Sequence, residues 1–288
     1  MNFYIVDVFA EDKYQGNQLA VFLLEKRFSE NDMQKIAKEM NFSETTFILS
    51  DKKIKEGYDV RIFTPDIELP FAGHPTLGTA FVIHKFLNHD KGEKIILNLG
   101  VGQIPVTINP QNEYWMTQKS PQFGKTIDAK IIADILQIDV ENIHKDYPVQ
   151  VVSTGLPAII VPLKTLDAVK KCAIKHSEFQ KLINDGVKAN ILVFTHDAEH
   201  SENDMHARVF MDDSGFLEDP ATGSANGNLA AYLLEHNFLN RFSITLNVEQ
   251  GYSIGRPSLI KVNADKKDGV FRIGIGGNVF LIAKGEWI

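Results

Sequence analysis

The chain has 288 residues, a formal net charge of −7, and 44% hydrophobic against 23% charged side chains. At roughly 100 to 200 residues per domain this length suits two domains, and the composition excludes a disordered chain. The excess of acid argues against a surface for nucleic acid or anionic lipid, which needs clustered basic residues. We therefore expect no nucleic-acid partner.

Features that would direct the chain to a membrane or an oxidising compartment are missing from the sequence. Residues 1–7 carry an acid and no basic residue, which argues against a signal peptide. The longest weakly polar stretch, 149–163, is interrupted by Gly155 and Pro157 and falls short of the roughly 20 apolar residues of a spanning helix. A single cysteine, Cys172, excludes an internal disulfide. We expect a cytoplasmic protein without a membrane partner.

Short β-branched and aromatic runs bounded by Gly, Pro, Asn or Asp recur along the whole chain and predict strands. In the first half they are Phe3 to Phe9, Leu19 to Leu24, Thr45 to Leu49, Tyr58 to Phe63, Lys94 to Leu99, Gln103 to Ile108 and Glu113 to Thr117. In the second half they are Val149 to Thr154, Ala158 to Pro162, Ile191 to Thr195, Ala207 to Met211, Ile244 to Val248, Leu259 to Val262, Val270 to Ile275 and Val279 to Ala283.

Helical periodicity is confined to a few segments. Two of them, Pro75 to Leu87 and Ala225 to His236, are apolar enough to be buried, and each follows a glycine. More polar segments predict outer helices at Glu30 to Met40, Ala129 to Leu136 and Glu178 to Asn184. Ser29 and Asp32 are typical of a helix cap at the first of these.

The two halves repeat one pattern of strand, glycine and strand, followed by Arg-x-Phe and a glycine-led buried helix. The alternative is two unrelated β-rich segments that share common residue types. A true repeat predicts an α+β fold of two pseudo-symmetric domains, each a curved, mostly antiparallel sheet or barrel around one central helix. We place the domains at residues 1–120, completed by the strand 278–288, and at residues 121–277. Free N–H groups at the two helix starts would favour a carboxylate-bearing ligand in a cleft between the domains.

Two residues of the first half are candidates for proton transfer. Glu44 stands at the mouth of an apolar strand, where a partly desolvated carboxylate can act as a base. The alternative is a strand-end acid exposed to water. His74 follows Gly73 at the start of the first buried helix, where its ring can donate, accept or carry a proton, although a lone histidine is usually structural.

The segment from Glu218 to Ser224 is the more specific signal of the second half. It places the acid Asp219 five residues before Ser224, around a loop whose N–H groups can bind an oxyanion. The alternative is an Asp-Pro turn followed by a helix cap.

Two further patterns match known motifs in spacing but lack the secondary structure that those motifs require. The segment from His196 to His200 has the spacing of a zinc-protease motif, but it lies in a short polar link between predicted strands rather than on a helix. The glycine patterns at 100–102 and 274–277 are not followed by the helix of a dinucleotide site. We therefore expect no metal and no nucleotide cofactor.

Taken together, these motifs resemble those of the phenazine-biosynthesis PhzF-like proteins, relatives of diaminopimelate epimerase. The resemblance spans nearly the whole chain, and its most specific block is Glu218-Asp219-Pro220-Ala221-Thr222-Gly223-Ser224. The other matching stretches are Val6-Asp7-Val8-Phe9 with Gly16-Asn17, Ser43-Glu44-Thr45, Arg61-Ile62-Phe63-Thr64-Pro65, Gly73-His74-Pro75-Thr76-Leu77, Gly155-Leu156-Pro157, and Gln250-Gly251 with Gly255-Arg256-Pro257-Ser258.

The resemblance implies a cofactor-independent isomerase, a homodimer, and a site between two epimerase-like domains. The epimerase relatives carry a cysteine at each helix start, where this chain has His74 and Ser224, so two-thiol racemisation is excluded. By the same resemblance Glu44 moves a proton between carbons of a small, carboxylated, cyclic amino acid. His74, Asp219 and Ser224 would orient the substrate and assist. We expect the substrate carboxylate to be held by N–H groups near Gly73 and at Thr222, Gly223 and Ala225.

Two other functions stay open on the sequence alone. Ser224, His74 and Asp219 have the residue types of a hydrolytic triad, although a nucleophile elbow is missing. A non-catalytic protein that binds a small ligand on the same scaffold is the other alternative. The sequence does not identify the substrate.

Overall fold

The structure is a computed structural model and describes residues 1–26, 28–87, 92–211 and 217–288. It separates into two compact units, residues 1–117 with 276–288 (unit 1) and residues 118–275 (unit 2). The sequence placed the corresponding boundaries near residues 120 and 277, and the status of each unit as a domain in its own right stays a prediction.

Unit 1 is a sheet that surrounds one helix. Its elements are β1 (Asn2–Val8), β2 (Asn17–Leu23), α1 (Glu30–Met40), β3 (Glu44–Ile48), β4 (Tyr58–Phe63), β5 (Glu68–Leu69), α2 (Gly73–Val82) with a π-helical continuation (Ile83–Leu87), β6 (Lys94–Leu99), β7 (Gly102–Ile108), β8 (Tyr114–Thr117) and β18 (Val279–Glu286). Strand β1 pairs with both β2 and β18. The last strand of the chain therefore belongs to the same sheet as the first.

Unit 2 is built in the same way. Its elements are β9 (Gln122–Thr126), α3 (Ala129–Leu136), η2 (Val140–Asn142), β10 (Gln150–Ser153), β11 (Pro157–Pro162), α4 (Leu166–Lys171), α5 (His176–Asn184), β12 (Asn190–Thr195), β13 (Met205–Phe210), β14 (Glu218–Asp219), α6 (Gly223–Glu235), β15 (Ser243–Gln250), η3 (Tyr252–Ile254), β16 (Ser258–Lys267) and most of β17 (Val270–Gly277).

Strand pairing follows one order in both units, and this confirms the predicted repeat. In unit 1, β1–β2 is antiparallel, β2–β3 parallel, β3–β4 and β4–β5 antiparallel, β4–β6 parallel and β6–β7 antiparallel. Unit 2 repeats these pairings in the same order and with the same directions, in strands β10, β11, β12, β13, β14, β15 and β16. Each parallel pair is joined through a helix, as parallel strands require.

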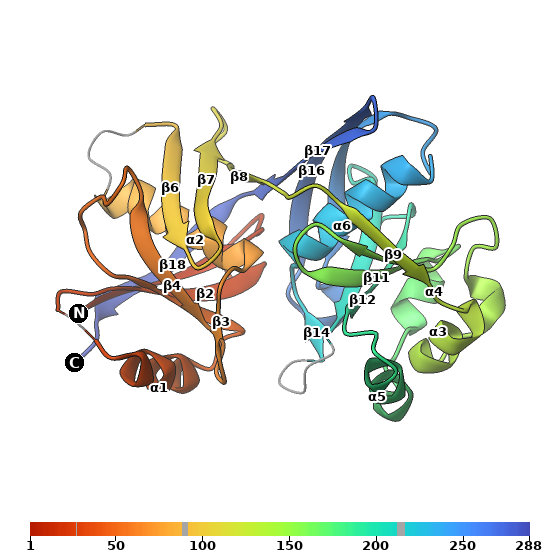
Figure 1. Ribbon diagram of the computed structural model, residues 1–288, viewed down its shortest axis with the longest axis horizontal. Coiled ribbons are helices and arrows are strands. Elements are labelled where there is room, and N and C mark those ends of the chain that lie inside the picture. The colour runs from red at the N-terminus through yellow and green to blue at the C-terminus, as the bar shows by residue number, and fades with distance from the viewer. Residues whose placement is uncertain (27, 88–91, 212–216) are drawn as a thin grey trace. The chain divides into compact units, whose positions relative to one another are not determined.

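The central helices are α2 and α6, and the sequence located both. Every residue of α2 is buried, and so is α6 from Gly223 to Leu234. Pro75 lies in the first turn of α2, where its missing N–H costs no helical hydrogen bond. Because a helix that is apolar all round needs cover on every side, each sheet curves around its own helix (Figure 1).

Outer helices cover the sheets from outside. In α1, Met33, Ile36 and Ala37 pack with Phe22 and Phe47 of the sheet. The predicted cap is confirmed, because the Ser29 hydroxyl accepts a hydrogen bond of 3.1 Å from the N–H of Asp32. Helices α3, α4 and α5 cover β11 and β12 of unit 2, and α4 was not expected from the sequence.

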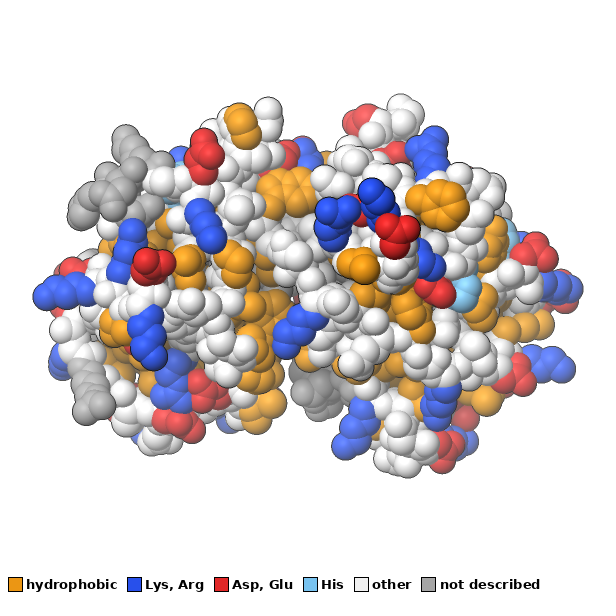
Figure 2. Space-filling view, turned by 45° about the horizontal axis from the view of Figure 1, so that its top comes forward, with side chains coloured by type: hydrophobic (Ala, Val, Ile, Leu, Met, Phe, Trp, Pro, Cys, Tyr) orange, Lys and Arg blue, Asp and Glu red, His pale blue; other side chains and the backbone are white. Residues whose placement is uncertain are grey.

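The surface carries charges of both signs. On the face that Figure 2 displays, acidic and basic side chains are interspersed over each unit. Among the residues that the structure describes, no helix combines the length and the apolar character needed to cross a membrane.

Candidate active site

In unit 1, a short hairpin leads into the central helix. Strand β5 pairs with β4 through Ile62–Leu69 and Phe63–Glu68, and the chain then turns through Pro70 into α2 at Gly73. No side chain caps this helix in the described part of the chain. The first N–H groups of a helix have no partner inside it, so the N–H groups of Gly73 and His74 are available to a ligand, whereas Pro75 has none.

Glu44 is placed beside this helix start by strand pairing. It is the first residue of β3 and lies opposite Leu19 of β2 in the parallel register. The hydroxyl of the preceding Ser43 donates a hydrogen bond of 3.3 Å to Oδ1 of the buried Asn17, which begins β2. These contacts fix the main chain that carries the carboxylate.

Glu44 and His74 face each other in unit 1. Oε2 of Glu44 lies 3.5 Å from Nε2 of His74, and the two side chains are 17% and 6% exposed, respectively. The alternative of a fully solvated acid at Glu44 is therefore wrong. Because little water reaches the pair, a charge on either group is poorly solvated there.

The imidazole of His74 is neutral at neutral pH. Burial lowers the pKa of His74 to about 3, and a hydrogen bond from the ring to the backbone of Gln18 opposes that shift only in part. Nε2 has no hydrogen-bond partner in the described part of the chain, so the bond to Gln18 comes from Nδ1. A neutral ring with its proton on Nδ1 carries a lone pair on Nε2, which faces Glu44.

In unit 2, the equivalent hairpin leads into α6. Strand β14 pairs with β13 through Val209–Asp219 and Phe210–Glu218, and the chain then turns through Pro220 to Gly223. Within the described chain no side chain caps α6 either. The N–H of Thr222 donates to Oε1 of Gln250 at 3.3 Å, so the first N–H groups left for a ligand are those of Gly223, Ser224 and Ala225.

Asp219 belongs to this turn and is buried. One of its carboxylate oxygens, Oδ2, accepts a short hydrogen bond from the hydroxyl of Thr222. The Thr222 hydroxyl and N–H are therefore both engaged within the protein, which moves the expected carboxylate binding from Thr222 to the three residues that follow.

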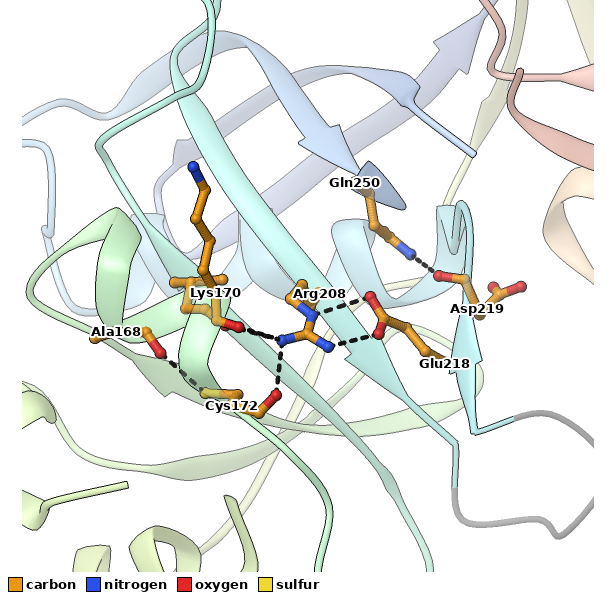
Figure 3. A network of polar contacts seen from close by, with 8 residues as sticks. Ala168, Lys170, Cys172, Arg208, Glu218, Asp219 and Gln250 are labelled. Atoms are coloured by element: carbon orange, nitrogen blue, oxygen red, sulfur yellow. Dashed lines mark hydrogen bonds and ion pairs between the residues drawn. The ribbon is translucent and has the colours of Figure 1, made fainter. Parts of the chain in front are cut away.

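A buried ion pair between Arg208 and Glu218 lies next to Asp219 of the turn (Figure 3). The guanidinium of Arg208 donates to both oxygens of Glu218, at 3.0 and 2.7 Å. Its remaining nitrogen donates to the carbonyls of Val169, Lys170 and Cys172 at the end of α4, at 3.0, 3.2 and 2.8 Å. Arg208 thus joins α4 to the strand that presents Asp219.

The structure gathers the predicted residues into two sets. Glu44, Gly73 and His74 lie together in unit 1, and Asp219, Thr222, Gly223, Ser224 and Ala225 lie together in unit 2. Sequence reasoning missed the backbone contact of Gln18 with His74 and the bonds of Gln250 with the turn. The repeated Arg-x-Phe followed by Glu-x-Pro-x-x-Gly was the available signal for the Arg208–Glu218 pair.

The zinc-protease spacing discounted in the sequence and the hydrolase alternative left open there both lack the local geometry of those classes. The segment from His196 to His200 is bends and irregular chain after β12, and no cluster of three metal-ligating side chains occurs among the described residues. Ser224 is the second residue of α6, in ordinary helical chain, whereas a nucleophile elbow holds its serine at a strained turn before the helix.

Known proteins match this chain over nearly its full length. The family model of phenazine biosynthesis-like proteins, PhzC-PhzF, matches residues 6–285. An uncharacterized isomerase of Clostridium acetobutylicum is 33% identical, with 100% of this chain and 98% of that protein covered. The trans-2,3-dihydro-3-hydroxyanthranilate isomerase of Pseudomonas fluorescens is also 33% identical, over 99% and 98% of the two chains.

A solved structure of a PhzF-family protein has the same fold as this chain. The PhzF-family phenazine biosynthesis protein of Bacillus anthracis superposes with a TM-score of 0.90 at 26% identity, covering 100% of this chain and 99% of that one. The chain therefore belongs to the PhzF-like family, which confirms the resemblance and the fold class predicted from the sequence. By this homology it is a PhzF-family isomerase.

Proposed function

We propose that this chain moves a proton between carbon atoms of a small carboxylated substrate, with Glu44 as the group that takes and returns the proton. The observation that carries the proposal is the desolvated Glu44–His74 pair, in which the ring is neutral. A neutral ring forms no ion pair with the carboxylate, so Glu44 keeps its capacity to accept a proton from carbon.

His74 has a part in this reaction that follows from its tautomer. When Glu44 has taken the proton, its O–H can donate to the lone pair on Nε2 of His74. The 3.5 Å between the two atoms is longer than a hydrogen bond, and such contacts commonly tighten when substrate binds. His74 thus stabilises the state in which the substrate has lost its proton and Glu44 holds it. No cofactor is needed for this transfer.

The N–H groups at the starts of α2 and α6 are the groups that would bind the substrate carboxylate. We assign to it the N–H groups of Gly73 in unit 1 and of Gly223, Ser224 and Ala225 in unit 2. Asp219 and Ser224 would bind and orient other polar groups of the same substrate. The name of the relative from Pseudomonas fluorescens supports a cyclic amino acid as the substrate class. A homodimer, implied by the family resemblance, stays a prediction.

The test is deuterium exchange in D2O. Purified protein is incubated with cyclic amino acids and related carboxylates, including trans-2,3-dihydro-3-hydroxyanthranilate, and deuterium uptake is followed by mass spectrometry. Glu44→Gln should lower the exchange rate by about 100- to 10,000-fold, the range typical of a general base. The variant should still bind the substrate when binding is measured by calorimetry.

A matched control separates this loss from a general effect of removing a carboxylate. Glu39→Gln changes an exposed glutamate of α1 and should leave exchange at the wild-type rate. Exchange by Glu44→Gln at the wild-type rate would remove Glu44 from the reaction. If the wild-type protein binds a carboxylate but exchanges no proton with it, a non-catalytic ligand-binding role is favoured. If the wild-type protein hydrolyses esters and Ser224→Ala does not, a hydrolase is favoured.

A further inference from the structure

Gln250, the last residue of β15, is completely buried against the turn that carries Asp219. Its Nε2 donates to the main-chain carbonyl of Asp219 at 2.8 Å, as Figure 3 shows, and to the hydroxyl oxygen of Thr222 at 3.1 Å. Its Oε1 accepts from the N–H of Thr222 at 3.3 Å and from Nδ2 of Asn226 at 2.9 Å. One side-chain amide therefore binds both sides of the turn.

The chemistry of these partners fixes the direction of every bond. A carbonyl only accepts and a backbone N–H only donates, so the oxygen and nitrogen of the Gln250 amide cannot exchange places. Because Nε2 donates to the Thr222 hydroxyl oxygen, the single proton of that hydroxyl is left to donate elsewhere. It donates to Oδ2 of Asp219. The hydrogen bonds thus run from Gln250 to Thr222 and from Thr222 to Asp219.

Unit 1 builds the same turn without any of these polar groups. The shared spacing of Glu68-x-Pro70-x-x-Gly73 and Glu218-x-Pro220-x-x-Gly223 places Leu69 at the position of Asp219 and Ala72 at that of Thr222. Leu99 ends β6 as Gln250 ends β15, and the glycine that follows each packs against the proline of the turn. The amide and hydroxyl are thus dispensable for the turn itself and occur in the unit whose turn carries Asp219.

We propose that Gln250 is a positioning residue, which holds the Asp219 carboxylate in its working orientation through the hydroxyl of Thr222. This rests on the proposed function, because Asp219 must contact the substrate for its orientation to affect the reaction. Gln250 itself is completely buried and acts only through the two residues it binds. The relay keeps Asp219 as an acceptor at Oδ2.

The first experiment replaces Gln250 with leucine, the residue that unit 1 has at the equivalent position. Gln250→Leu should lower kcat for deuterium exchange by about 10- to 100-fold, the effect of a misplaced catalytic group, with a smaller change in KM. The matched control is Tyr232→Phe, which removes a partly buried hydrogen bond of 2.7 Å from another residue of α6 to the carbonyl of Pro148. The control should exchange at the wild-type rate.

A double-mutant cycle separates positioning from a merely structural role. Thr222→Val removes the hydroxyl that joins Gln250 to Asp219 and should lower kcat to a similar degree. If Gln250 acts through that hydroxyl, Gln250→Leu causes no further loss of kcat in the Thr222→Val protein. Losses that multiply, or a wild-type kcat in Gln250→Leu, would overturn the proposal. Gln250→Glu, which keeps the shape but loses the Nε2 donor, serves in the same cycle should the leucine variant fail to fold.

A structural readout keeps this proposal separate from the proposed function. If the wild-type protein exchanges no proton with any carboxylate tested, the proposed function fails, and crystal structures of wild type and Gln250→Leu then decide the positioning role. The Thr222–Asp219 hydrogen bond should be lost and the Asp219 side chain should adopt another rotamer in the variant. An unchanged Asp219 would overturn the proposal.

Discussion

The hairpin before α2 and the hairpin before α6 share a framework and differ in chemistry. Each has an arginine that pairs with the glutamate of the turn and stacks on a phenylalanine two residues further along the chain. In unit 1, Arg61 pairs with Glu68 and lies 5.1 Å from the ring of Phe63. In unit 2, Arg208 pairs with Glu218 and lies 4.7 Å from the ring of Phe210.

The two hairpins share the residues of the turn, and the positions at which they differ include the residues to which we assign roles in the proposed reaction. Arginine, glutamate, proline and glycine recur in both units, where a short hairpin leads into a buried helix. From the glutamate of the turn to the second residue of the helix, the differing positions at which at least one unit has a polar side chain are Leu69 and Asp219, Ala72 and Thr222, and His74 and Ser224. A repeated fold thus offers an internal reference, in which one unit shows how much of the other is structural.

The largest expected difference between the two units concerns their ion pairs. The side chains of Arg208 and Glu218 are 9% and 6% exposed, against 26% and 34% for Arg61 and Glu68. Arg208→Ala should cost about 3 to 5 kcal/mol, because it leaves a buried carboxylate without its partner. Arg61→Ala should cost about 1 kcal/mol or less, since water can replace the lost pair. Urea denaturation of both variants measures the difference, and equal losses would contradict it.

The next difference concerns the glycine that packs against each proline. Gly251 has a φ of +80°, and a Cβ there would lie 2.6 Å from the carbonyl oxygen of Pro220. Gly100 would place its Cβ 3.0 Å from Cα of Pro70, without a positive φ. We expect Gly251→Ala to cost about 2 to 3 kcal/mol, from left-handed backbone and steric overlap, and Gly100→Ala about 1 kcal/mol. Thermal unfolding of the pair tests this order, which a larger loss in Gly100→Ala would reverse.

The smallest effect concerns the first side chains of the two central helices. His74 has a folded-state pKa of about 3, below its ordinary value of 6.5. Below pH 6.5 the unfolded chain therefore binds a proton that the folded chain does not, and stability falls as the pH decreases towards 3. Between pH 6 and pH 5 the loss should be about 1 kcal/mol.

The variant His74→Ser isolates this contribution, because it introduces the residue that unit 2 has at the same position and serine does not titrate. Urea denaturation at several pH values should show a shallower decline for His74→Ser than for the wild type. Parallel curves for the two proteins would show that His74 takes up its proton equally in the folded and unfolded chains.

Much of the fold could be predicted because it depends on local patterns. The helices α1 and α3 have the predicted ends, and the first and last residues of most long strands lie within two residues of the prediction. The segments that were missed carry weak patterns. Strand β9 is mostly exposed and contains Gly124 and Lys125, α4 has only six residues, and β5 and β14 have two each.

The candidate site was only partly predictable, because its chemistry depends on burial and on distant contacts. Glu44 and His74 stood out as chemical groups, but their mutual approach requires the parallel pairing of β2 and β3. The neutral state of His74 follows from its burial, which a sequence does not show. Gln250 meets Thr222 and Asp219 across 28 and 31 residues of chain, and the amide alone carries no pattern that announces such contacts.

The pairing of β1 with β18 has a consequence for the order in which the molecule can form. Unit 2 is one continuous stretch of chain, residues 118–275, whereas unit 1 needs residues on both sides of that stretch. Translation delivers β1 before unit 2 and β18 only after every residue of unit 2. During synthesis the edge of β1 that will receive β18 therefore stays exposed, while unit 2 can already bury its core.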